Sequence, residues 1–432
     1  MTMKKTFLFF TLLLLASVIC SSSCSYHNDD NPNEYPDPQP EPEPEPEPQP
    51  DVNEKYLEAS YTPNCFMVKP GESVDIPVLK AYAIWDLYAE WLGKSDFTGM
   101  TPEPVLLWQD APGLITNVGL IPGQTAEDGS IVVSTADKVG NAVIGIRIGG
   151  EIRWSWHIWV CNDEITAHDH IDSEGKVAAV IMDRNLGALN NTPMDVGNRG
   201  MFYEWGRKDP FTPSRSPYHA DTDGNNVPAY NEPNTAIGDG TGTWVYNAQA
   251  AVLATPPANI PNSILNPMTY LQSPYNGHAD WYCTGTDPKA THPGLWGPEK
   301  TIFDPCPPGY KVPGPDLWGI PAGNNSITNG GAAADYDETG VSAKWDWNAY
   351  EDCGRRWKNT GDYYPMAGNI YYTDYISESI CNYTGGMAFY WTAQATPDAT
   401  KSSAYFVNFN PNWCNYRLGE HDCSAQIRCI RE

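Results

Sequence analysis

The clearest pattern in the chain is an alternation of apolar positions over residues 140–160. On both sides of Gly149-Gly150, every second position is apolar: Ala142, Ile144, Ile146, Ile148, Ile152, Trp154, Trp156, Ile158 and Val160. A period of two is the period of side chains along a strand, and two adjacent glycines accept the positive φ of a tight hairpin turn. The pattern therefore predicts a β-hairpin with one face buried against a second layer.

Shorter apolar runs on both sides of this hairpin predict further strands. They cover residues 73–78 and 104–108 before it, and residues 176–182, 389–393, 404–409 and 427–430 after it. Turn-forming Gly, Pro, Asn and Asp separate these runs, and no long helical periodicity is evident. The chain is therefore expected to be mainly β, with an immunoglobulin-like β-sandwich over residues 55–165.

The run Trp154-Ser155-Trp156-His157-Ile158-Trp159 is open to two interpretations. Its aromatic rings could form a platform for a sugar. The alternation instead assigns Trp154 and Trp156 to the buried face and leaves His157 and Trp159 on the other. We favour the interpretation that the run belongs to the core.

The first residues are typical of a secretory signal. Lys4-Lys5 precede an apolar run from Phe7 to Ile19, which is too short to span a bilayer permanently. Ser21-Ser22-Ser23-Cys24 then resembles the lipobox of bacterial lipoproteins, with Cys20 as the competing site. The resemblance implies that residues 1–23 are removed and that Cys24 is acylated to anchor the chain in a membrane.

Residues 24–54 have the composition of a stiff tether. Proline occupies every second position from Pro36 to Pro50, mostly alternating with Glu, and the segment holds ten carboxylates. Such a segment favours polyproline II and would reach on the order of 90 Å if fully extended. An acidic stretch after the lipid cysteine also resembles the surface-export signal of Bacteroidetes lipoproteins, although a plain spacer is the alternative. We expect a lipoprotein on the outer face of the outer membrane.

Composition excludes some partners of the body of the chain. Residues 55–432 carry a net charge of about −19. Nucleic-acid binding needs clusters of Lys and Arg against phosphates, so no nucleic-acid partner is expected. Anionic lipid surfaces would repel the body as well.

The body contains nine cysteines: Cys65, Cys161, Cys283, Cys306, Cys353, Cys381, Cys414, Cys423 and Cys429. Export permits disulfides, and the odd number leaves at least one cysteine outside any intrachain pair. The absence of a C-x-x-C pair argues against a cysteine metal site. Cys65 and Cys161 stand near the two ends of the first domain and could be joined, but their spacing alone does not decide this.

A second region, residues 175–432, carries a series of separated motifs: Asp183-Arg184-Asn185-Leu186-Gly187, Gly200-Met201-Phe202-Tyr203-Glu204-Trp205-Gly206, Asp304-Pro305-Cys306-Pro307-Pro308-Gly309-Tyr310, Phe389-Tyr390-Trp391 and Ile427-Arg428-Cys429-Ile430. In this order they resemble the Fibrobacter succinogenes major paralogous domain of Bacteroidetes and Fibrobacteres surface proteins. Residues 212–300, rich in Pro, Asn and Gly, would be an insertion in that domain.

The cysteine motif, the late Trp391 strand and the final Arg-Cys strand look like the C-type-lectin-like α+β scaffold, which formylglycine-generating enzymes also use. The resemblance implies disulfides Cys306–Cys429 and Cys414–Cys423. The first would close a loop of over 120 residues and stabilise the fold by about 4–5 kcal/mol. The sequence departs from the pattern at Pro313-Gly314-Pro315-Asp316, where the first helix normally begins.

Candidates for chemistry are few. His168 and His170 could ligate a metal, but a His-x-His pair in a polar linker is more often solvated. Glu232-Pro233-Asn234 matches the sugar- and calcium-binding tripeptide of C-type lectins, but it precedes Cys306 and is interpreted as coincidence. No G-x-S-x-G, H-E-x-x-H or Walker motif occurs. No catalytic residue, metal or cofactor is predicted.

The sequence thus predicts a non-enzymatic surface module for adhesion or for glycan- or fimbria-associated recognition, with a glycan or a surface protein as ligand. Loop tryptophans could stack on sugar rings, namely Trp296, Trp345, Trp347, Trp357 and Trp413. The alternatives are an enzyme on the same scaffold, acting on surface polysaccharide or protein, and a purely structural subunit.

Overall fold

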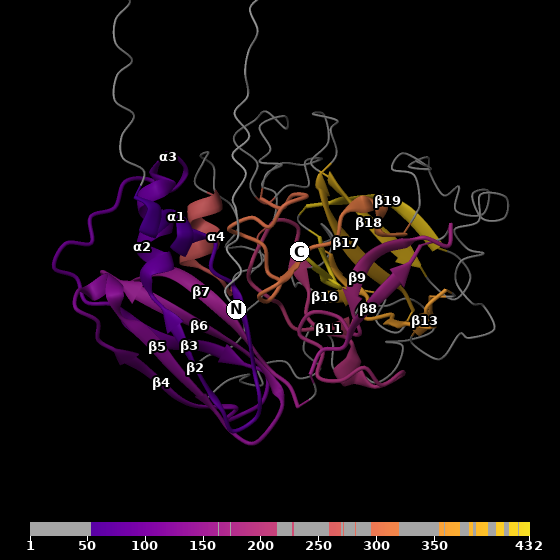
Figure 1. The fold of residues 1–432 in the computed structure, drawn as a ribbon, viewed down its shortest axis with the longest axis horizontal. Coiled ribbons are helices and arrows are strands. Elements are labelled where there is room, and N and C mark those ends of the chain that lie inside the picture. Colours follow the sequence, from indigo (N-terminus) through magenta and orange to yellow (C-terminus); the bar gives the residue numbers. More distant parts are fainter. Residues whose placement is uncertain are drawn as a thin grey trace, which may run out of the picture. The chain divides into compact units, whose positions relative to one another are not determined.

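The computed structural model describes 53–213 apart from 163 and 173, and beyond that 227–228, 259–268, 271, 281, 295–318, 354–371 apart from 358, 380–382, 386–395, 403–409, 414–421 and 423–432 (Figure 1). The signal segment, Cys24 and the tether therefore lie outside the described residues. Within the described residues, no helix is long and apolar enough to cross a membrane.

Two sheets dominate the N-terminal part of the body. One has the strand order β1-β7-β6-β3, comprising β1 (Cys65–Val68), β7 (Glu151–Val160), β6 (Gly140–Ile148) and β3 (Glu103–Gln109). The other has the order β2-β5-β4, comprising β2 (Ser73–Pro77), β5 (Ser130–Thr135) and β4 (Ile115–Ile121). The expected hairpin is confirmed: β6 and β7 pair antiparallel, and Gly149 and Gly150 have φ of 67° and 84°.

Short helices that the apolar pattern did not indicate also lie in this part (Figure 1). They are α1 (Glu54–Ser60), α2 (Leu79–Leu87), α3 (Ala89–Leu92) and the 3₁₀ turn η1 (Ala126–Asp128). The Asn53 side chain caps α1 by accepting a hydrogen bond from Tyr56 N. Six consecutive residues of α2, from Lys80 to Trp85, are buried, so this helix has no amphipathic stripe for a periodicity to reveal.

The C-terminal part is also built mainly from strands. One sheet has the order β12-β21-β9-β8, comprising β12 (Tyr310–Lys311), β21 (Ile430–Arg431), β9 (Val177–Met182) and β8 (Ala167–Ile171). A second has the order β17-β18-β19, comprising β17 (Ala388–Ala395), β18 (Ser403–Phe409) and β19 (Cys414–Glu420). The expectation of a mainly β chain is therefore confirmed.

Smaller elements complete this part. The short sheets pair β10 (Tyr203–Glu204) with β20 (Ser424–Ala425), β13 (Gly354–Arg356) with β14 (Tyr363–Pro365), and β11 (Val227–Pro228) and β15 (Asn369–Tyr371) with β16 (Ile380–Asn382). The helical segments are η2 (Val196–Asn198), α4 (Asn259–Leu265) and η3 (Pro315–Trp318). The 3₁₀ turn η3 begins at Pro315, in a first turn where the missing amide donor of proline is tolerated.

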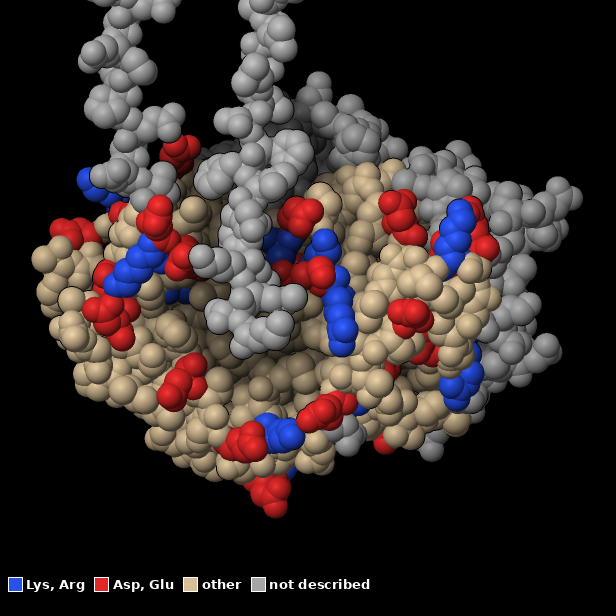
Figure 2. All heavy atoms as spheres, in the orientation of Figure 1, with Lys and Arg blue, Asp and Glu red and all other residues tan. Residues whose placement is uncertain are grey.

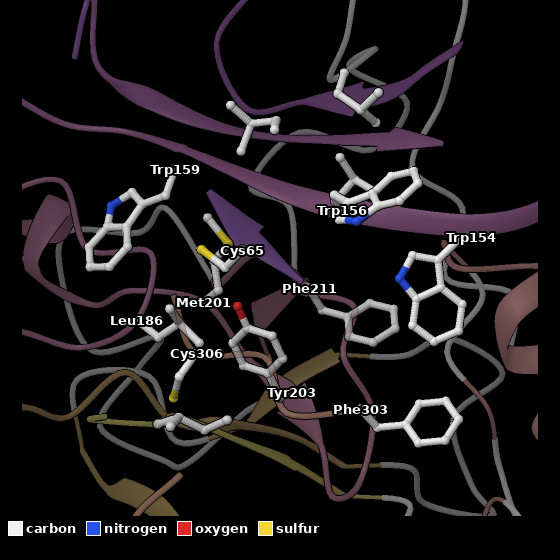
Figure 3. Close-up of a cluster of buried hydrophobic side chains, with 14 of the residues drawn as sticks. Cys65, Trp154, Trp156, Trp159, Leu186, Met201, Tyr203, Phe211, Phe303 and Cys306 are labelled. Carbon is white, nitrogen blue, oxygen red and sulfur yellow. The ribbon is translucent and has the colours of Figure 1, made fainter. Parts of the chain in front are cut away.

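The two parts share one apolar core. Residues Val52–Glu432 form a single compact unit, and one cluster of buried side chains draws from both parts. Figure 3 shows this cluster, in which Cys65, Trp154 and Trp156 from the N-terminal strands lie near Tyr203, Phe211 and Phe303 from the C-terminal part. Helix α4, from within residues 212–300, also packs against β7.

Candidate functional site

One of the expected disulfides is present. Cys306 and Cys429 are bonded, with their Cα atoms 6.1 Å apart across a sequence separation of 123 residues. The bond joins the segment before β12 to the segment before β21. The side chain of Cys414 lies outside the described residues, so the second expected pair with Cys423 is not placed; Cys423 itself is buried.

A bridge between Cys65 and Cys161, which the sequence left open, is not formed. Strand β1 pairs parallel to β7 with Cys65 opposite His157, whereas the Cys161 amide bonds to Val68 O at 3.1 Å. Four residues of strand therefore separate the two cysteines, about 13 Å at the rise of a strand, and a disulfide needs Cα atoms within about 7 Å.

The tryptophans of β7 are buried on both of its faces. Trp154, Trp156 and Trp159 are each at most 1% exposed, and His157 is 1% exposed. The expected inward position of Trp154 and Trp156 is confirmed. The face assigned to His157 and Trp159 is not open, because the C-terminal part covers it: Trp159 Nε1 donates to Ala188 O at 2.9 Å.

Two of the loop tryptophans expected to stack on sugars are also buried. Trp296 is 1% exposed and Trp357 is 0% exposed, and their indole nitrogens donate to Phe303 O and Ile171 O. They pack within the fold and are not available to a ligand. Trp345, Trp347 and Trp413, like Glu232-Pro233-Asn234, lie outside the described residues.

The histidine pair lies on strand β8 and not in a linker. His168 Nε2 is 2.9 Å from Asp362 Oδ2, and His170 is fully buried, stacked on Trp357 with ring centroids 5.4 Å apart. Burial lowers the pKa of His170 to about 4. Among the described residues, no three His, Cys, Asp or Glu side chains come together as a metal site.

A polar cluster lies buried where the two parts meet. Lys208 Nζ donates to Asp209 Oδ1 at 2.7 Å and to the Ser155 hydroxyl, which itself donates to Asp209 Oδ1 at 2.6 Å. Nearby, Lys208 lies 4.6 Å from the centroid of Trp154. Burial lowers the pKa of Lys208 even though Asp209 opposes that shift. Ser155, Lys208 and Asp209 are each at most 3% exposed, so this cluster holds the two parts together and is closed to a substrate.

An open site is found on the N-terminal part, and we call it the Tyr82 pocket. It has a volume of about 640 Å³ and lies between α1, α2, residues 94–99 and η1. Its walls combine aromatic rings with carboxylates, namely those of Tyr56, Tyr82, Phe97, Asp86, Asp96 and Glu127.

The hydroxyl groups of this pocket differ in their partners. Tyr56 OH donates to Glu127 Oε2 at 2.5 Å, and Lys55 Nζ lies 3.1 Å from Glu127 Oε1. The hydroxyl of Tyr82 is buried and has no hydrogen-bond partner within the described residues. Burial raises the pKa of Tyr82, and the charge of Glu127 raises it further, so the hydroxyl stays protonated. The Tyr82 hydroxyl can therefore both donate and accept a hydrogen bond, and neither capacity is used within the described residues.

A smaller pocket of about 290 Å³ lies between Asp110, Asn141 and residues 187–213. Both carboxylate oxygens of Asp110 already accept hydrogen bonds from Asn141, at 2.7 and 3.0 Å. Its main polar group is thus satisfied within the protein, and the Tyr82 pocket is the stronger candidate.

Sequence reasoning missed the Tyr82 pocket because its lining comes from four separate short segments between residues 56 and 127. No motif joins these segments, and α2 was not predicted as a helix. The sequence offers one weak indication of a polar site here, because Asp86 places a carboxylate at the end of an otherwise apolar run.

Comparison with known proteins gives no match: no family model, no curated protein and no solved structure is similar to this chain.

Proposed function

We propose that this chain is an exported lipoprotein, anchored through Cys24 at the outer-membrane surface, whose body is a non-enzymatic glycan-binding module. The signal segment, the lipobox and the proline- and acid-rich tether support the anchor and the display. The absence of basic clusters in the sequence supports a ligand other than nucleic acid or anionic lipid.

Within this proposal, residues 55–165 are an immunoglobulin-like spacer and residues 175–432 a Fibrobacter succinogenes major paralogous domain on a C-type-lectin-like scaffold. The two sheets of the N-terminal part support the first assignment. The Cys306–Cys429 bond, which is the long-range pair of that scaffold, supports the second.

The Tyr82 pocket carries the proposal of glycan binding. A sugar presents apolar ring faces and hydroxyl groups, and binding sites for such ligands combine aromatic surface with a few placed polar groups. The pocket offers Tyr56 and Phe97 as aromatic surface and an unpartnered hydroxyl at Tyr82. Its volume lies within the usual range for ligand sites, about 300–1,000 Å³.

Binding is favoured over catalysis because the cysteine side chains that the structure describes and the cluster of Ser155, Lys208 and Asp209 are enclosed. The cysteines whose side chains are described are buried, namely Cys65, Cys161, Cys306, Cys423 and Cys429, and so are Ser155, Lys208 and Asp209. An enzyme needs its nucleophile or its acid and base within reach of substrate.

A glycan array with the mature, non-lipidated chain, residues 25–432, tests the proposal. We expect binding to a defined set of glycans and a loss of about threefold to tenfold in affinity for Tyr82→Phe, the value of one hydrogen bond. The same variant should unfold at unchanged or higher denaturant concentration, because it removes a buried hydroxyl that has no partner.

Tyr203→Phe is the matched control. The Tyr203 hydroxyl lies 3.2 Å from His157 Nδ1 and neither residue lines the pocket, so its loss should cost about 1 kcal/mol of unfolding free energy and leave glycan affinity unchanged. Binding to no glycan at all would refute the proposal. Binding that Tyr82→Phe leaves untouched would move the site away from this pocket.

A further inference from the structure

Resting on the proposed glycan-binding function, we infer that the Tyr82 pocket selects sugars that carry a protonated amine, that is, amino sugars without an N-acetyl group. The inference rests on the balance of charge around the pocket and on the unpartnered hydroxyl inside it.

Carboxylates outnumber cations in the lining. Asp86, Asp96 and Glu127 line the pocket together with one lysine, Lys94. Asp86 and Asp96 form no ion pair within the part of the chain that the structure describes, and hydrogen bonds from Thr98 lower the pKa of the Asp96 carboxyl. Both carboxylates are exposed and therefore available to a ligand.

Two cations near the pocket, Lys55 and Arg153, are already engaged, whereas Lys94 in the lining forms no ion pair within the described residues. Lys55 lies 3.1 Å from Glu127 and 2.7 Å from Asp128, so its charge is shared between two carboxylates. Arg153 lies 5.3 Å from the Phe97 ring centroid, and its Nη2 is 2.6 Å from Glu151 Oε2. With Lys94 and Lys55 counted against Asp86, Asp96 and Glu127, the formal charge of the pocket is still negative, which attracts a positively charged ligand.

The interior of the pocket suits an ammonium group bound through hydrogen bonds. Tyr82 is 7% exposed, and its unpartnered hydroxyl can accept an N–H bond from an ammonium. The Tyr82 and Phe97 rings meet edge to face with centroids 5.5 Å apart. Aromatic faces also attract cations, as the position of Arg153 against Phe97 illustrates.

The arrangement of the carboxylates favours an organic cation over a metal ion. A metal needs several ligands converging at about 2–2.6 Å, whereas no three acidic or histidine side chains converge among the described residues. The carboxylates instead line a space of about 640 Å³, large enough for a sugar with its amine at one side.

The wider surface is consistent with this preference. On the face seen in Figure 2, Lys and Arg side chains of the described residues are scattered and lie beside Asp or Glu. Because residues 55–432 carry a net charge of about −19, an anionic glycan would meet repulsion on approach, and an amino sugar would meet attraction that weakens as salt is added.

Titration calorimetry with the mature, non-lipidated chain tests whether a free amine on the sugar strengthens binding. The probes are a β-1,4-linked glucosamine trimer and the matching N-acetylglucosamine trimer. We expect the free-amine trimer to bind at least about fivefold more tightly at low salt, and the difference to shrink between about 0.05 and 0.5 M NaCl. Asp86→Asn should weaken binding of the free-amine trimer by about threefold and binding of the acetylated trimer by less.

Asp75→Asn, an exposed aspartate on β2 outside the pocket, is the matched charge control and should change neither affinity. Equal affinity for the two trimers would overturn the amine preference while leaving glycan binding intact. An equal loss in Asp86→Asn and Asp75→Asn would also overturn it, because the attraction would then come from the whole body. If neither trimer nor any arrayed glycan binds, the proposed function fails together with the inference.

Discussion

At the scale of single residues, a chain of hydrogen bonds defines the state of His157. Asn141 Nδ2 donates to Asp110 Oδ2 and to Gly187 O, so Asn141 Oδ1 faces His157 Nε2 as an acceptor at 2.9 Å. His157 therefore carries its proton on Nε2, and Nδ1 accepts from Tyr203 OH. The neutral imidazole is fully satisfied, and burial lowers its pKa to about 3.

This depressed pKa predicts a loss of stability in acid. An unfolded histidine takes up a proton near pH 6.5 and the folded one only near pH 3, so the unfolded state binds more protons between these values. The contribution of His157 is complete above about pH 6.5 and is lost as the pH falls towards 3, at up to about 1.4 kcal/mol per pH unit. Denaturant unfolding of the wild type and of His157→Gln between about pH 7 and 4 measures it.

The free energy of unfolding should fall less steeply with acid in His157→Gln than in the wild type. Equal slopes would mean that the folded protein protonates His157 readily. His170, with a pKa of about 4, should contribute in the same direction and over a narrower range.

At the scale of elements, one asparagine joins the start of β1 to the C-terminal part. Asn64 Nδ2 donates to Ile302 O and Asp304 O at 2.8 Å each, and Asn64 Oδ1 accepts from Trp154 Nε1 at 3.0 Å. Asn64 is 2% exposed, so water cannot replace these bonds. The asparagine thus satisfies two buried carbonyls and one buried indole.

Asn64→Ala should lower the free energy of unfolding by about 2–4 kcal/mol, because it leaves buried polar groups without partners. Asn117→Ala, at an exposed position of β4, is the control and should stay within about 0.5 kcal/mol of the wild type. A similar small effect in both variants would show that water reaches the Asn64 site.

At the scale of the whole molecule, the shared core predicts cooperative unfolding of the two parts. Trp154 packs near Phe303, Ser155 bonds to Asp209 and Trp159 bonds to Ala188, so the N-terminal sheets depend on residues far along the chain. We expect residues 25–432 to unfold in one transition, with coincident fluorescence and circular dichroism curves. Two separated transitions would contradict this coupling.

Local sequence determined much of the secondary structure. Alternation over residues 140–160 specified the β6–β7 hairpin, because side-chain direction in a strand depends only on position and Gly149-Gly150 supplies the turn. The apolar runs at 104–108 and 404–409 likewise became β3 and β18. The bond between Cys306 and Cys429 was indicated by the order of motifs along residues 175–432 and by the family that this order resembles.

Tertiary structure decided what each face and each polar group does. Asn64 and Asp304 are 240 residues apart, and Trp159 and Ala188 are 29 apart. A periodic pattern within one strand therefore cannot predict that the residues of each pair form a hydrogen bond. Local sequence likewise does not predict the register of β1 on β7, which places Cys65 opposite His157 and excludes the bridge to Cys161. Nor does it predict that four separate segments assemble into the Tyr82 pocket. The local pattern records which side chains avoid water, whereas only packing between distant segments determines what they meet instead.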